Sequence, residues 1–245
     1  MKPRDLHLDL LKGFSIFLVI LGHCIQFGSG QEFFEKSLYY DNILFKLIYS
    51  FHMPLFSLIS GYFFYSTANK YNLLTIMKRR FLQLLLPVFI IYFIYYTLIA
   101  FMHHGEFSSK DYLTWYLSSC YSSFWFLWAT FLISILLSFT HHHLKDNIFI
   151  YLFFLIITLI TPDSGSSIML YKFVYPYFLI GYYFKKNNYS NSFIWKKCNS
   201  IYGSLTILLI FSGLFLLYSN DSYIYTTGIF ILRNFPIQIF IDIYR

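Results

Sequence analysis

One apolar segment, residues 8–27, carries side chains whose types and spacing suit chemistry. Lys12 and His23 are eleven residues apart, which is about three turns at ~3.6 residues per turn, so on a helix they share one face. An imidazole titrates near neutral pH and can take a proton from a hydroxyl group. The ammonium group of Lys12 can hold an anion, and Asp9, three residues earlier, is placed to pair with it. Ionisable groups inside an apolar helix usually face a polar cavity and mark a functional site.

A simpler explanation covers part of this pattern. Asp9 and Lys12 could simply form an ion pair at the membrane surface, where the lysine side chain extends to water. That explanation does not extend to His23, which follows Gly22, where another backbone or a substrate can come close. Cys24 is not expected to act as a nucleophile with His23, because adjacent helix positions point about 100° apart.

A second polar group lies in the next apolar run, residues 43–65. It contains His52, followed by Pro54, which is expected to kink the helix and free a backbone carbonyl. Ser60 and Gly61 form a notch of small residues where two helices can approach closely. A kinked packing helix would explain the proline and glycine alone, whereas a second histidine in the same bundle favours a polar chamber.

A third group is basic and consists of Lys78, Arg79 and Arg80, shortly before Pro87. Such a cluster at the start of a membrane helix is typical of a cytoplasmic anchor. The same guanidinium groups would suit phosphates, with which arginine makes charge-assisted hydrogen bonds. On the residues alone, the anchor is the favoured interpretation.

Metal and nucleic-acid binding are not expected. The histidine clusters at 103–104 and 141–143 have no carboxylate at ligand spacing, and the three cysteines form no CxxC pair. The net charge of +7 comes from basic residues in short loops between apolar runs, a pattern that orients a membrane protein.

The elements that must position these residues are membrane helices. The chain is 58% hydrophobic and 12% charged, about half the ~25% charged residues of a soluble domain. Several apolar runs are long enough to cross a hydrocarbon core of about 30 Å, where the backbone can satisfy its hydrogen bonds only as a helix. We therefore expect an all-α, polytopic transmembrane bundle in a single domain over residues 1–245. The expected spans are seven regular ones, at 8–27, 43–65, 81–102, 121–139, 147–161, 168–184 and 201–218, and a less regular eighth at 223–241.

The basic residues predict an orientation. The first span is expected to be retained, because no small-x-small cleavage site follows His23. With these spans, twelve lysines and arginines fall on the side of the amino terminus and three on the other, which places the amino terminus in the cytoplasm. The twelve are Lys2, Arg4, Lys12, Lys70, Lys78, Arg79, Arg80, Lys145, Lys185, Lys186, Lys196 and Lys197, and the three are Lys36, Lys110 and Lys172.

Five stretches carry a specific resemblance. In chain order they are RDLHLDLLKGFSIFLVILGH, FHMPLFSLISGYFF, the RR run leading to LLLP, FWFLWATFLISILL and YFLIGYYFKK, over most of residues 4–186. Together they resemble the membrane acyltransferase-3 family, and most of all its group of fucose 4-O-acetylase and related acetyltransferases. The Lys12–His23 spacing matches the family's pattern of a basic residue, ten intervening residues and a histidine.

The resemblance implies an O-acyltransferase of a bacterial cell membrane. It would move an acyl group, usually acetyl, from acyl-CoA to a sugar hydroxyl of a surface glycan or its lipid-linked precursor, with no permanently bound cofactor. It implies His23 as the general base and Lys12, Arg79 and Arg80 as contacts for the donor's phosphates. The cavity would be lined by Asp9, His52, Ser60, Gly61 and Trp125.

Two alternatives stay open. A transporter or exporter would line its path with the same polar groups. The family also has closing helices, and the sequence after residue 186 offers no counterpart to them. C-terminal helices are therefore expected to be missing. In this alternative, the chain would be an inactive remnant of the acyltransferase.

Overall fold

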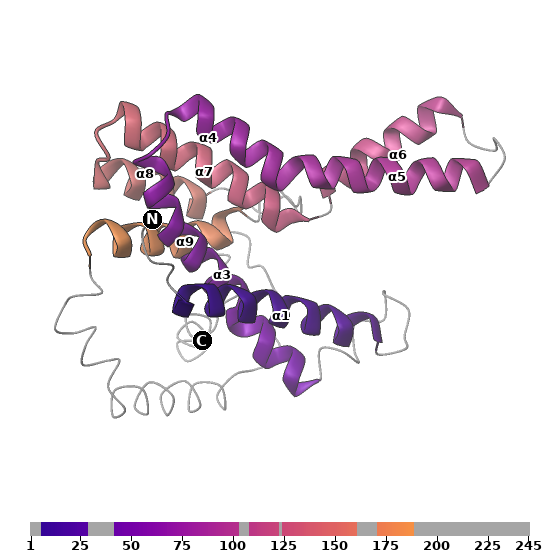
Figure 1. The fold of residues 1–245 in the computed structure, drawn as a ribbon, viewed down its shortest axis with the longest axis horizontal. Helices are drawn as coiled ribbons and strands as arrows, with labels where there is room; N and C mark the ends of the chain where they lie inside the picture. Colours follow the sequence, from indigo (N-terminus) through magenta and orange to yellow (C-terminus); the bar gives the residue numbers. More distant parts are fainter. Residues whose placement is uncertain (1–5, 29–41, 103–107, 123, 161–170, 189–245) are drawn as a thin grey trace. The chain divides into compact units, whose positions relative to one another are not determined.

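The computed structural model describes residues 6–28, 42–102, 108–122, 124–160 and 171–188. In these ranges every regular element is a helix, so the fold is all-α as the composition predicts (Figure 1). The elements are α1 (Leu6–Gly28), α3 (Ile43–Ala68), α4 (Leu73–Arg80), the π-helical turn η1 (Phe81–Leu85), α5 (Leu86–Met102), α6 (Ser109–Ser122), α7 (Trp125–His143), α8 (Ile148–Ile160) and α9 (Tyr171–Lys186).

The first six predicted spans each overlap a helix, and the last two, at 201–218 and 223–241, lie outside the described residues. Among the described residues, three helical segments are long and apolar enough to cross a membrane, and their composition indicates a membrane location. They are Asp9–Gln26, Leu73–Met102 and Trp125–His143. The count of seven or eight spans stays a prediction.

The helix of the third predicted span begins two turns earlier than its apolar run. Asn72 caps α4, its side-chain oxygen accepting a hydrogen bond from the backbone N–H of Thr75 at 3.0 Å. An asparagine in this position satisfies a backbone donor that the first turn leaves without a partner. Arg79 and Arg80 therefore lie inside the helix, in the last turn of α4, and not ahead of its start.

A π-helical turn joins α4 to α5 just ahead of Pro87. The N–H of Leu86 donates to the carbonyl of Phe81, five residues back. In a regular α-helix the ring of Pro87 would clash with the carbonyl of Gln83, and no N–H would be present to bond it. The wider turn relieves this conflict, so one helical rod continues through the proline (Figure 1).

The described chain divides into two units. The first comprises Met1–Tyr65 and Tyr177–Arg245, and the second comprises Ser66–Pro176. In the second unit α7 packs against α4 and η1, while α6 lies alongside α5 (Figure 1). The buried side of α7 carries small and branched residues, among them Ala129, Ile133 and Leu137. The Tyr96 hydroxyl and Ser119 Oγ, 2.7 Å apart, link α5 to α6.

The turn between α7 and α8, also in the second unit, has an unusual backbone. Lys145 and Asp146 both have a φ of 54°, in the left-handed region that costs energy for residues other than glycine. The N–H of Asp146 donates to the Thr140 carbonyl at 3.1 Å, and its carboxylate accepts a hydrogen bond from the buried Tyr151 hydroxyl. Tyr175 donates in turn to the Tyr151 carbonyl at 3.0 Å, so these bonds hold the strained turn in place.

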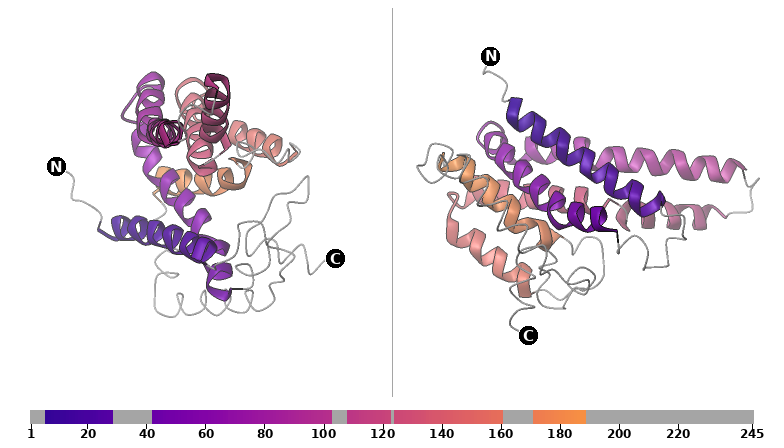
Figure 2. Two further views of the ribbon diagram at one scale, coloured as in Figure 1. Left: turned by 90° about the vertical axis from the view of Figure 1, so that its right-hand side faces the viewer. Right: turned by 90° about the horizontal axis from the view of Figure 1, so that it is seen from below.

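In the first unit, α3 and the carboxyl-terminal part of α9 lie side by side (Figure 2), and two glycines form their contact. A Cβ added to Gly61 would overlap the backbone carbonyl of Phe178, and one added to Gly181 would overlap that of Leu58. The contact is reciprocal, because each glycine faces the carbonyl three residues before the other. This confirms the close helix approach predicted at Gly61.

Candidate active site

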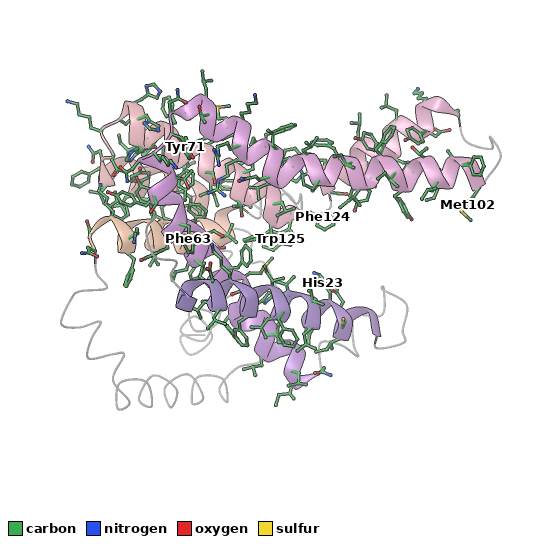
Figure 3. All side chains as sticks on the ribbon, viewed as in Figure 1. His23, Phe63, Tyr71, Met102, Phe124 and Trp125 are labelled. Carbon is green, nitrogen blue, oxygen red and sulfur yellow. The ribbon has the colours of Figure 1, made fainter. Side chains whose placement is uncertain are left out.

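The structure divides the predicted site residues between the two units; of these residues, Figure 3 labels His23 of the first unit and Trp125 of the second. The first unit holds Asp9, Lys12, His23, His52, Ser60 and Gly61, and the second holds Arg79, Arg80 and Trp125. The six residues of the first unit come from only two helices, α1 and α3.

His23 is exposed on α1, and its Nδ1 lies 3.1 Å from the side-chain oxygen of Gln26. With that oxygen as the acceptor, Nδ1 carries the proton and the lone pair of the neutral ring is on Nε2. Gln26 is thus the residue that orients the imidazole. Its spacing of three residues from His23 on one helix was the signal available in the sequence.

His52 is buried, with 3% of its surface exposed. Its Nδ1 lies 2.7 Å from the carbonyl of Ile48, one turn earlier on α3. A carbonyl oxygen can only accept, so Nδ1 is the donor and the neutral ring again has its lone pair on Nε2.

Lys12 places its ammonium nitrogen 3.4 Å from the ring centroid of Phe63 on α3. Lys185 of α9 contacts the neighbouring ring, that of Tyr62. Its ammonium group donates a hydrogen bond to the Tyr62 hydroxyl at 3.0 Å, and its nitrogen lies 4.6 Å from the Tyr62 ring centroid. The pairing of Lys12 with Asp9, which is half-buried on α1, stays a prediction. Lys185 was expected only to orient the chain, and its position beside Tyr62 is new information from the structure.

Gly61 and Ser60 have different surroundings. Gly61 is buried against the backbone of α9, whereas Ser60 is half-buried. The role of both in lining a cavity stays a prediction.

The basic cluster of the second unit gathers around Tyr71, in the turn before α4. The guanidinium carbon of Arg79 lies 4.4 Å from the Tyr71 ring centroid, and the Lys70 nitrogen lies 5.2 Å from it. The pKa of Tyr71 is lowered, chiefly by a hydrogen bond from Lys70 and further by the charge of Arg79. Arg80 is half-buried and Arg79 exposed, so the described surface here is strongly cationic.

Trp125 is the first residue of α7 and follows Phe124, whose φ of 52° is left-handed. This backbone turns the chain into the helix, where Trp125 is half-buried with its ring edge-on to that of Phe126, at a centroid distance of 5.8 Å. Its role in lining a cavity stays a prediction.

Comparison with known proteins gives an independent line of evidence. A family model described as an acyltransferase domain matches residues 5–241. The nodulation protein NolL of Mesorhizobium japonicum is 32% identical over 196 residues, which cover 79% of this chain and 51% of NolL. NolL of Sinorhizobium fredii is 33% identical over 187 residues, covering 74% of this chain and 49% of that protein.

The chain thus spans about half the length of the curated relatives it matches. No solved structure matches it significantly. The family model extends over almost all of the chain, and it covers the helices that carry His23, His52 and the basic cluster. The chain therefore belongs to the acyltransferase-3 family of membrane proteins.

Proposed function

We propose that the protein is a membrane O-acyltransferase that moves an acetyl group from acetyl-CoA to a sugar hydroxyl. The observation that carries this proposal is the oriented imidazole of His23, held through Nδ1 by Gln26 on the helix that also bears Lys12. Acyl transfer to an alcohol needs a base at the attacking oxygen, and an imidazole supplies it near neutral pH.

In the proposed reaction, His23 Nε2 takes the proton of the sugar hydroxyl as that oxygen attacks the thioester carbonyl. The new C–O bond forms a tetrahedral intermediate, and the C–S bond then breaks. The proton passes from His23 to the departing sulfur, which gives CoA thiol and the acetylated sugar. Gln26 holds the imidazole through Nδ1 throughout, so that Nε2 stays directed at the proton that is transferred.

The donor would bind from the cytoplasm. CoA is a polyanion, and Lys12, Arg79 and Arg80 lie among the basic residues that the charge distribution assigns to the cytoplasmic side. We place the protein in the cell membrane with a cytoplasmic amino terminus and seven or eight spans. The acceptor would be a surface glycan of a bacterial cell envelope or its lipid-linked precursor.

Two measurements test this function. The first is binding of acetyl-CoA to the purified chain in detergent, and the second is the O-acetyl content of host glycans with and without the gene. Acetyl-CoA binding together with gene-dependent acetylation is expected. A transporter of other solutes would bind no acetyl-CoA, and an inactive remnant would show no gene-dependent acetylation; either result contradicts the proposal.

Gln26→Ala is expected to lower the rate of acetylation roughly tenfold. This is only part of the rate enhancement of ~10²–10⁴-fold that a general base supplies. The imidazole would remain, but the hydrogen bond that selects its tautomer would be lost. Gln26→Glu keeps an acceptor at the same place and should retain most of the activity. Equal activity of the alanine variant and the wild type would show that His23 is oriented by other means.

A further inference from the structure

Two lysines from distant parts of the chain converge on neighbouring rings of α3 in the first unit. Lys12 of α1 lies over Phe63, and Lys185 of α9 lies over Tyr62. The centroids of these two rings are 5.6 Å apart. Both ammonium groups therefore lie within the length of one extended ligand.

The groups that hold the two lysines are neutral. An ammonium group over an aromatic face is attracted by the ring without losing its charge. Lys185 gains in addition a hydrogen bond to the Tyr62 hydroxyl. The contacts that hold Lys12 and Lys185 here are made by aromatic rings and a hydroxyl group, none of which neutralises an ammonium charge. The cluster thus keeps two positive charges in fixed positions, as an anion site requires.

The chemistry that fits is a ligand with phosphate groups at more than one position. CoA carries a pyrophosphate and a separate ribose phosphate, and an ammonium group binds each as a point charge. Phospholipid head groups offer the same chemistry at a membrane surface. CoA is the better match, because Lys12 shares the face of α1 that carries His23.

We propose that Lys185 is a second contact for the donor's phosphates beside Lys12, and that the Tyr62 hydroxyl positions its ammonium group. This inference rests on the proposed acyltransferase function. It assigns a ligand-binding role to the end of α9, which the sequence marks only as basic. The Tyr62–Lys185 pair depends in turn on the close packing of α3 and α9 at Gly61 and Gly181.

The test is CoA binding by the purified full chain in a neutral detergent, measured by calorimetry for the wild type and four variants. Lys185→Ala and Lys185→Gln should each weaken binding about tenfold, which is ~1.4 kcal/mol; the glutamine keeps most of the chain that packs over Tyr62. Tyr62→Phe keeps the ring and should weaken binding by a smaller factor. The matched control is Lys186→Ala, whose ammonium lies 5.1 Å from the Tyr183 ring centroid, and it should bind as the wild type does.

The outcomes separate the two proposals. If the wild type binds no CoA, the proposed function itself fails. If the wild type binds CoA and both Lys185 variants bind it equally well, this inference fails while the function stands. Titration with an anionic phospholipid in the same detergent tells the two ligand sources apart. If Lys185→Gln binds CoA as the wild type does but binds the phospholipid more weakly, the assignment of Lys185 to the donor is overturned.

Discussion

His23→Ala is expected to abolish acetylation of the host glycan while leaving the protein folded and inserted in the membrane. The substitution removes the only group of the proposed reaction that takes the hydroxyl proton, and a general base is worth ~10²–10⁴ in rate. Its side chain is exposed on α1, so its loss leaves no buried cavity. The measurements are the glycan's O-acetyl content and the amount of protein in the membrane fraction. Acetyl-CoA binding should persist, because the proposed phosphate contacts are untouched.

The matched control is His142→Ala, an exposed histidine near the end of α7 that has no part in the proposed reaction. It should acetylate as the wild type does. Normal acetylation by the His23→Ala variant would contradict the base assignment. Loss of activity in both variants would point instead to a general sensitivity of the protein to histidine replacement.

The helices were predictable because lipid leaves the backbone no other partner. The predicted first span at 8–27 differs from α1, Leu6–Gly28, by two residues at its start and one at its end. The helix of the third span starts before the predicted span, 81–102, for a physical reason. An apolar run marks the stretch that crosses hydrocarbon, whereas a helix starts where its first turn is capped. Asn72 supplies that cap, so α4 continues back beyond the basic cluster.

The candidate site was predictable only along single helices. The shared face of Lys12 and His23 follows from their spacing, and Gln26 could have been found by the same rule. Lys185 reaches Tyr62 only because α9 packs on α3, so its place in the cluster required the structure.

Gly61→Ala is expected to disrupt the first unit, because two helix backbones touch at this glycine. A Cβ at this position would meet the backbone of Phe178, with the carbonyl carbon only 2.8 Å away. Backbone atoms cannot relieve a clash by changing rotamer as a flexible side chain can, so α3 and α9 would have to move apart. Overpacking of this kind costs about 1–3 kcal/mol, occasionally more. The expected result is a lower Tm in detergent, or a smaller yield of folded protein, with acetylation reduced in proportion.

Gly181→Ala should reproduce this loss, because the same contact is reciprocal and its Cβ would lie 2.8 Å from the Leu58 carbonyl carbon. Gly13→Ala provides the control, since a Cβ there would meet no atom within 4 Å. Alanine favours a helix over glycine by about 1 kcal/mol, so that variant should keep or raise the Tm. If all three variants melted alike, the backbones of α3 and α9 would not touch at these glycines. The positioning of Lys185 beside Tyr62 would then need a different explanation, because that pair depends on the same packing.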